Sequence, residues 1–170
     1  KGAGGTELDE IEKYVSEASA VLSDRHVSLL YSHAVILAFR SFELMMLELI
    51  AGCINRDSTH FTTTQQINQK HLSYPMSKYL LTKGRYFDVK NREELLKTIK
   101  NYLGDDHWLR KVIKERKYKD TLEHFSALRN YAAHNSEYSR NRLLEITNRT
   151  RLSEPGSWLK AKNRFGLMVK

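Results

Sequence analysis

The feature that most constrains the fold is segment 25–54, where apolar side chains nearly surround the helix that their spacing predicts. These residues are Val27, Leu30, Tyr31, Ala34, Val35, Leu37, Ala38, Phe42, Met45, Met46, Leu49 and Ile50. A helix that is apolar on all sides is typical of a buried position, so we expect it at the centre of the fold. With Asp24 as its cap, it would span about 45 Å at 1.5 Å per residue. That length is large for a small domain, and we expect a bend or break within it.

The same segment could be taken for a membrane helix, but the charged residues within it argue against this. Arg40, Glu43 and Glu48 interrupt the run, and the 170-residue chain has no stretch of about 18 apolar residues. The beginning of the sequence lacks the basic and then apolar layout of a secretory signal. The single cysteine, Cys53, excludes an intramolecular disulfide, and its apolar surroundings predict buried packing. We therefore expect a soluble, cytoplasmic protein.

The rest of the sequence predicts further helices and no strands. Thr6 and Asp9 resemble a capping box at the start of one helix, so residues 1–6 would be a flexible lead-in or a cloning remnant. Other helices are expected at 65–72, 75–83, 91–103 (capped by Asn91 and ended by Gly104), 105–113, 120–135, 137–149 and 155–169. The predicted fold class is all-α, with residues 7–170 forming a single bundle-like domain.

Charge is distributed unevenly along the chain, whose total is +8. Residues 1–109 carry 13 Lys and Arg against 14 Asp and Glu, whereas residues 110–170 carry 15 against 6, a net of +9. A basic C-terminal third attracts polyanions, so this pattern favours a nucleic acid or nucleotide as partner. The alternative is a solvated basic face that only maintains solubility.

Cations of this C-terminal third are the candidates for contact with RNA phosphates. They are Arg140, Arg142, Arg149, Arg151, Lys160 and Lys162. Trp158 and Phe165 lie among the last of them and could stack on a base, although their spacing with neighbouring apolar residues favours the core.

The segment most suggestive of chemistry is 128–135, in which Arg129 and Asn130 precede His134. No Walker-type phosphate loop and no HExxH pattern occurs, and the histidines are not spaced to build a metal site within one helix. We therefore expect neither a metal nor another cofactor.

The residues Arg129-Asn130-x-x-x-His134 resemble the R-N-x-x-x-H motif of the HEPN (higher eukaryotes and prokaryotes nucleotide-binding) superfamily. The layout is similar too, with an early apolar helix that carries an internal acidic residue, Glu43, and a late helix that carries the motif. One toxin branch of the superfamily has Tyr two residues after the His, where this chain has Ser136, with Tyr138 two residues further on.

This resemblance implies an all-helical domain that cleaves RNA without a metal, in toxin, phage-defence or RNA-processing systems. It also implies a homodimer in which two motifs meet across a two-fold axis and form one composite site. An antitoxin or another partner protein would accompany a toxin.

The chemistry of the motif residues fits these implications. Cleavage through the 2′-hydroxyl needs proton transfer, which suits His134, and positive donors around the phosphate, which suits Arg129. Asn130 would orient His134 or the phosphate. Glu43 would hold Arg129 or His134 in place, and Asn135 is a second supporting residue.

An ideal helix does not place the two principal residues side by side. Asn130 and His134 are four residues apart and share a face, whereas Arg129 and His134 are about 140° apart around the axis. Three arrangements would bring them together: the Arg side chain curls around the helix, the helix distorts, or a second subunit supplies a partner.

Another interpretation gives the same residues a structural role. Arg129 would pair with Glu123 or another carboxylate, while His134 and Asn135 would end a helix, His134 being favoured there by the helix dipole. The protein would then be a non-catalytic HEPN-like module that binds RNA, nucleotide or a protein, or a helical scaffold without a nucleic-acid role.

Overall fold

The computed structural model describes residues 4–152 and 154–160, and every regular element within them is a helix. In chain order these helices are α1 (Gly4–Val21), α2 (Asp24–Arg56), α3 (Thr59–Thr64), α4 (Tyr74–Thr82), α5 (Arg92–Leu103), α6 (Trp108–Lys114), α7 (Arg116–His134), α8 (Glu137–Thr147) and α9 (Pro155–Lys160). The all-α fold class expected from the sequence is confirmed. None of the described helices combines the length and the apolar character needed to cross a bilayer.

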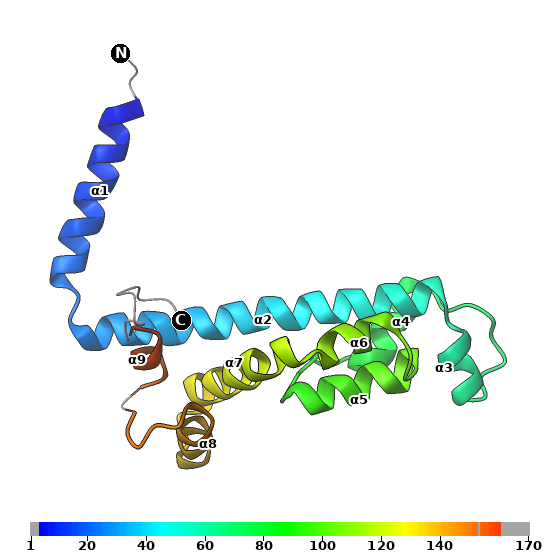
Figure 1. Cartoon of the computed structure of the whole chain (residues 1–170). Helices are drawn as coiled ribbons and strands as arrows, with labels where there is room; N and C mark the ends of the chain where they lie inside the picture. Colours follow the sequence, from blue (N-terminus) through cyan, green and yellow to red (C-terminus); the bar gives the residue numbers. More distant parts are fainter. Residues whose placement is uncertain (1–3, 153, 161–170) are drawn as a thin grey trace.

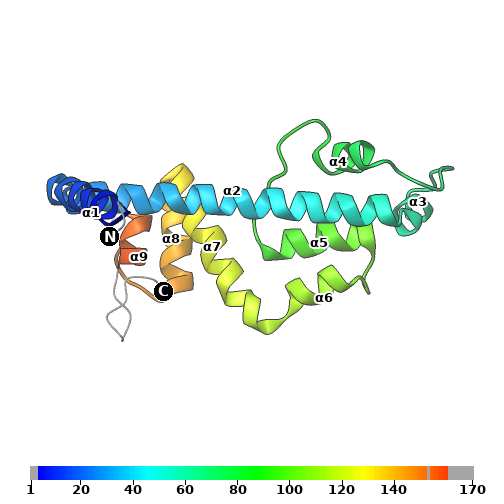
Figure 2. The same ribbon diagram turned by 90° about the horizontal axis from the view of Figure 1, so that it is seen from above.

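Helix α2 is the axis of the fold and runs without interruption, so the expected bend is absent. Its cap is Ser23 rather than Asp24, because the Ser23 hydroxyl accepts a hydrogen bond from the His26 N–H. Figure 1 shows most of the other helices below α2, and Figure 2 shows α4 on one side of it and α6 and α7 on the other. Packing along its length keeps α2 straight, whereas α1 leads away from the other helices (Figure 1).

Two apolar clusters cover the inner side of α2. The larger cluster surrounds Met46, Ile50 and Ile54 in its C-terminal half, with side chains from α5 and α6. The smaller cluster surrounds Val35 in its N-terminal half, with side chains from α7, α8 and α9. Phe125 of α7 packs against both clusters, so α7 crosses α2 at their junction.

Helix α9 packs on α2 through a contact that requires glycine. The Gly156 N–H donates a hydrogen bond to the Ser32 hydroxyl at 2.9 Å. A Cβ on Gly156 would lie 1.9 Å from the carbonyl oxygen of Ser28. The two backbones can approach this closely only because the side chain is missing. The part of the predicted helix 155–169 beyond Lys160 lies outside the described residues.

Helix boundaries agree with expectation where a local polar signal sets them. The Asn91 side chain accepts a hydrogen bond from the Glu94 N–H at 2.9 Å and caps α5, which ends at Gly104 with φ +95°. The helix predicted at 65–72 is wrong: α3 precedes it, and residues 65–73 are not helical. A tertiary contact explains the loop, because the buried Ser58 hydroxyl accepts a hydrogen bond from the Leu72 N–H at 2.9 Å.

Three other helices begin away from the predicted residue. Helix α1 begins at Gly4, two residues before Thr6, and residues 1–3 of the predicted lead-in lie outside the described part. Helix α6 begins at Trp108 because His107, rather than an aspartate, caps it. Helix α7 begins at Arg116, four residues before the predicted start.

Candidate functional site

The predicted motif lies in the last two turns of α7, where the chain turns into α8. Arg129 and Asn130 are half-buried, and His134 is the exposed last residue of the helix. Asn135 adopts the left-handed conformation (φ 44°, ψ 35°), and its N–H donates to a carbonyl four residues back at 2.9 Å, which ends α7. Ser136 caps α8 immediately afterwards, so α8 starts beside the end of α7.

A cleft of about 410 Å³ lies between the end of α7, the start of α8 and the segment before α5. Arg129, Asn130 and His134 all border this cleft, so a single chain brings the three motif residues together while α7 stays helical. The Arg129 guanidinium donates hydrogen bonds to Asn130, Glu43 and Asp88, and the arrangement in which a second subunit supplies a partner stays a prediction. Asn135 contributes its backbone turn and is not among the residues that border the cleft.

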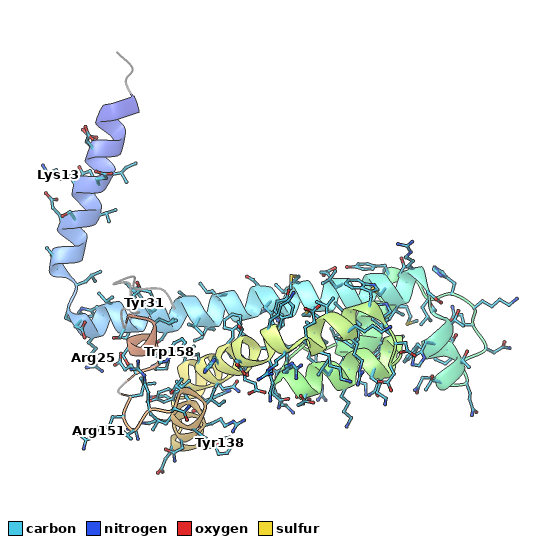
Figure 3. The ribbon with its side chains drawn as sticks, in the orientation of Figure 1. Lys13, Arg25, Tyr31, Tyr138, Arg151 and Trp158 are labelled. Atoms are coloured by element: carbon cyan, nitrogen blue, oxygen red, sulfur yellow. The ribbon has the colours of Figure 1, made fainter. Side chains whose placement is uncertain are left out.

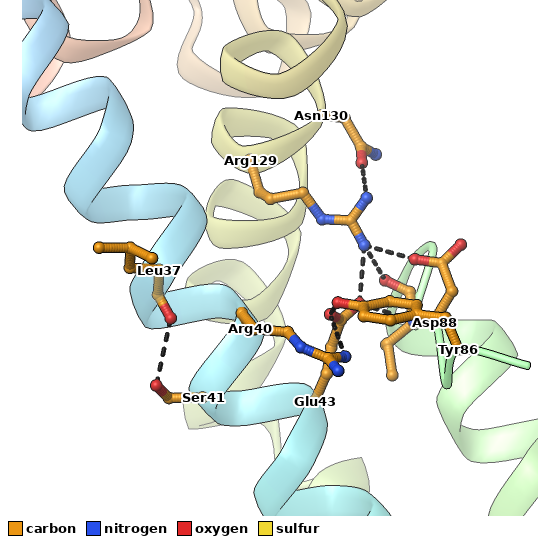
Figure 4. A network of polar contacts seen from close by, with 9 residues as sticks. Leu37, Arg40, Ser41, Glu43, Tyr86, Asp88, Arg129 and Asn130 are labelled. Atoms are coloured by element: carbon orange, nitrogen blue, oxygen red, sulfur yellow. Dashed lines mark hydrogen bonds and ion pairs between the residues drawn. The ribbon is translucent and has the colours of Figure 1, made fainter. Parts of the chain in front are cut away.

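Glu43 is a buried carboxylate between α2 and α7, with polar partners on both oxygens (Figure 4). Its side chain is 1% exposed. Oε1 accepts hydrogen bonds from Arg129 Nη2 at 2.8 Å and from the Val89 N–H at 3.0 Å. Oε2 accepts one from the Tyr86 hydroxyl, and Arg40 Nη1 lies 3.8 Å from it. The negative charge is thus compensated, as a buried ion requires.

Arg129 is held at the edge of the cleft, with its side chain 13% exposed. Besides its bond to Glu43, Nη2 donates to Asp88 Oδ1 at 2.6 Å, and Nη1 donates to Asn130 Oδ1 at 2.9 Å. The guanidinium also lies over the Phe39 ring, 4.6 Å from its centroid. Two carboxylates therefore share this cation, and one of them, Asp88, is 40% exposed.

Tyr86 and Asp88 also belong to this site, although the sequence did not predict them. They alternate with Phe87 and Val89, which are buried in the larger cluster, so every second side chain of this extended segment is directed toward Glu43 or Arg129. The alternation of polar and buried apolar residues over 86–89 could have indicated these two residues, but it is only four residues long. Partial burial raises the pKa of the Tyr86 hydroxyl above its ordinary value, and the hydrogen bond to Glu43 raises it further.

Three further residues give the cleft positive charge and an aromatic rim. Arg142 of α8, a predicted RNA contact, borders the cleft and pairs with Glu145 at 2.7 Å. Lys90 borders it from the opposite side. Tyr138 also borders it and is 83% exposed.

The other predicted RNA contacts lie elsewhere. Arg140 donates through Nε to the Leu152 carbonyl at 3.2 Å, which ties α8 to the following segment. Arg149 is half-buried, and Arg151 extends away from the helices (Figure 3). The Lys160 side chain and the whole of Lys162 lie outside the described part of the chain.

Cys53 does not have the surroundings of an activated nucleophile. It is half-buried on α2, and burial raises the pKa of its thiol, which Arg56 only partly opposes. Among the residues that the structure describes, no group of three or more His, Cys, Asp or Glu is placed to hold a metal ion.

No protein-family model matches the chain, and no curated protein or solved structure is similar enough to match it. The structure itself shows an all-α protein in which the buried ion pair between Glu43 and Arg129 lies beside a cleft.

Proposed function

We propose that this protein is a metal-independent endoribonuclease and that the cleft at the end of α7 binds the phosphodiester to be cut. The observation that carries the proposal is that Arg129, Asn130 and His134 border the same cleft. The resemblance to the HEPN motif supports the same residues. The net charge of +9 over residues 110–170 suits a polyanionic substrate.

The proposed reaction uses the 2′-hydroxyl of the RNA as nucleophile. The 2′-oxygen bonds to phosphorus as its proton is removed, and the bond from phosphorus to the 5′-oxygen breaks as that oxygen gains a proton. The products are a 2′,3′-cyclic phosphate and a 5′-hydroxyl, and the proton balance closes within the RNA and the protein. His134 is assigned to proton transfer, because histidine exchanges protons near neutral pH.

Arg129 is assigned to charge stabilisation at the phosphate oxygens. Its Nη2 is engaged by Glu43 and Asp88, so a phosphate would compete with Asp88, the more exposed of the two. Lys90 and Arg142 add positive charge around the cleft. Glu43 is a positioning residue in this proposal, because it orients Arg129 from the buried side.

A second copy of the chain is part of the proposal, because the reaction needs both a base and an acid. His134 is the one histidine among the described residues that border the cleft. The partner's His134 would supply the second proton-transfer group, as the HEPN resemblance implies. An excess of the His134→Ala chain mixed with the wild-type chain should then lower the wild-type activity, because a mixed dimer contains only one of the two proton-transfer groups.

The decisive experiment is incubation of the purified chain with an end-labelled single-stranded RNA in the presence of EDTA. His134→Ala should lower the cleavage rate by roughly 10²–10⁴-fold, the usual contribution of general acid–base catalysis. His71→Ala, which changes an exposed histidine between α3 and α4, should leave the rate unchanged. Loss of activity in EDTA, products with a 3′-hydroxyl or full activity of His134→Ala would each contradict the proposal.

A non-catalytic RNA-binding module is the second candidate, and the compensation of Arg129 by Glu43 and Asp88 favours it. A cation held in this way supports the fold and offers less charge to a transition state. Salt-dependent RNA binding without cleavage, weakened by Arg142→Glu, would identify this function.

A toxin or phage-defence role, with an antitoxin as partner, is proposed from the HEPN resemblance alone. Such a role would appear as growth arrest when the chain is expressed in a bacterial host, and His134→Ala should relieve the arrest.

A further inference from the structure

The side of α2 opposite Phe39 and Glu43 is apolar and uncovered. Leu30, Leu37 and Leu44 recur on it at intervals of seven residues, and they are 57%, 56% and 41% exposed. We define the outer face of α2 as residues 30, 34, 37, 41, 44 and 45, which share this side of the helix. Figure 4 shows Leu37 on the side of α2 turned away from Arg129.

The polar member of the outer face adds little polarity. The Ser41 hydroxyl donates a hydrogen bond to the Leu37 carbonyl at 3.1 Å, so its donor is satisfied within α2 (Figure 4). Together with the neighbouring Leu29 and Leu49, the outer face forms an apolar patch on the order of 500 Å², at the upper end of what monomers expose.

Helix α1 is a second apolar element that no other described helix covers. Every α1 side chain that the structure describes is exposed. Ile11, Tyr14, Val15 and Val21 lie within about one third of the helix circumference, as in an amphipathic helix that packs on another element. Figures 1 and 2 show α1 leaving the end of α2 without turning back along it.

Charge distinguishes α1 from the rest of the chain. Residues 4–21 carry five acidic groups and one lysine, a net of −4, although the whole chain carries +8. The rest of the chain outside residues 4–21 therefore carries a net charge of +12. The acidic helix α1 of one copy is thus complementary in charge to the rest of a second copy.

We propose that the outer face of α2 and α1 form the interface of a homodimer, in which α1 of each copy packs on the outer face of the other copy. Each chain supplies both halves of the contact, so a two-fold axis forms two identical contacts at once. The apolar surfaces of α1 and of the outer face together offer on the order of 1,000 Å² per copy, above the roughly 800 Å² per partner of a standard stable interface.

A second copy is a better occupant than the chain's own α1. Only Leu22 and Ser23 separate the two helices, and the Ser23 capping box fixes where α2 begins. The cleft at the end of α7 lies on the inner side of α2, so this interface does not bring the two copies of His134 together, and the contact across the cleft in the proposed function would be a separate one. The inference therefore stands independently of the proposed function.

The test is the mass of the chain in solution, measured by sedimentation equilibrium between 1 and 100 µM at low salt. We expect at least twice the 19.9 kDa of one chain. Leu37→Glu should weaken dimerisation at least tenfold, because it places a charge in an apolar contact. Val15→Glu should weaken it similarly from the side of α1. Met76→Glu changes another exposed apolar residue, on α4, and should leave the association unchanged.

Both glutamate positions are solvent-exposed in the single chain, so far-UV circular dichroism should show unchanged helix content. A mass of one chain at every concentration would overturn the proposal and would favour α1 folded on its own α2 or a different partner. A mass that Leu37→Glu leaves unchanged would overturn it as well. Loss of the dimer with Leu37→Glu but not with Val15→Glu would exclude the role of α1.

Discussion

The two sides of α2 are built from similar residues but are buried very differently. Phe39, on the inner side, is 1% exposed and packs against the Phe125 ring with 4.9 Å between the centroids. Leu37, two residues earlier on the outer face, is 56% exposed. The difference comes from the neighbours, because α5, α7 and α9 pack along the inner side. An apolar residue type therefore predicts that a position can be buried, whereas the covering element decides whether it is.

The acidic residues of α2 also differ in burial between its two sides, and replacing the buried one, Glu43, should have the largest effect on the free energy of unfolding. Glu43→Ala would remove the acceptor of Arg129, of the Val89 N–H and of the Tyr86 hydroxyl. A largely buried cation would keep Asp88 as its nearest carboxylate. We expect a loss of about 3–5 kcal/mol in the free energy of unfolding, measured by urea denaturation.

The matched control for this substitution is Glu48→Ala on the exposed side of α2. Glu48 is 47% exposed and pairs with Lys78 at 2.5 Å. An exposed pair of this kind contributes less than about 1 kcal/mol. If both substitutions lower the free energy of unfolding by the same amount, the burial of the side chain does not determine how much it stabilises the fold.

Replacing two glycines, one on each side of α2, should give the next largest difference in the free energy of unfolding. Gly156→Ala would push α9 away from the inner side, because the new Cβ would lie 1.9 Å from the Ser28 carbonyl oxygen. We expect a loss of roughly 1–3 kcal/mol, as for other overpacked contacts. Gly52→Ala adds a Cβ where no atom lies within 4 Å. It should stabilise the chain by roughly 0.5–1 kcal/mol through helix propensity. Urea denaturation of both variants checks the signs, and a stabilised Gly156→Ala would contradict the close contact.

The parts of the fold that follow local rules could be predicted from the sequence. Asn91 and Gly104 bound α5 because a cap and a left-handed end act within one turn. The predicted bend in α2 was wrong because straightness depends on helices that pack along it. The helix expected at 65–72 was wrong because Ser58 holds the Leu72 backbone across a loop. Those contacts join distant residues, and no spacing rule contains them.

In the candidate site too, local spacing could be predicted from the sequence, whereas contacts between distant residues could not. The spacing of Asn130 and His134 predicted a shared face, and the structure places both beside one cleft. The contact between Glu43 and Arg129 spans 86 residues, and the sequence supported it only through the HEPN resemblance. Asp88 and Tyr86 were missed, because their segment has too few residues for its alternation to stand out. The catalytic roles of these residues remain predictions.

The smallest expected effect on the free energy of unfolding is that of His107, which is half-buried near the C-terminal end of α2. His107 and Gly52 border a cleft of about 680 Å³ there, between α2 and α6. His107 caps α6, since its Nδ1 accepts a hydrogen bond from the Leu109 N–H at 3.2 Å. Burial lowers the pKa of His107 below its ordinary value of 6.5, and Asp57 partly opposes this.

Because the folded-state pKa is lowered, the unfolded chain takes up this proton first as the pH falls. The stabilisation is therefore present above pH 6.5 and is lost as the pH falls through the lower pKa of the folded chain. Protonation also removes the lone pair that caps α6. Between pH 7.5 and 5, the wild-type chain should lose up to about 1 kcal/mol more than His107→Asn, whose amide caps without titrating. Urea denaturation at several pH values measures this difference. If the free energies of unfolding of the two chains change in parallel with pH, burial does not lower the pKa of His107. Its side chain would then be as accessible to solvent as a residue on the outer face.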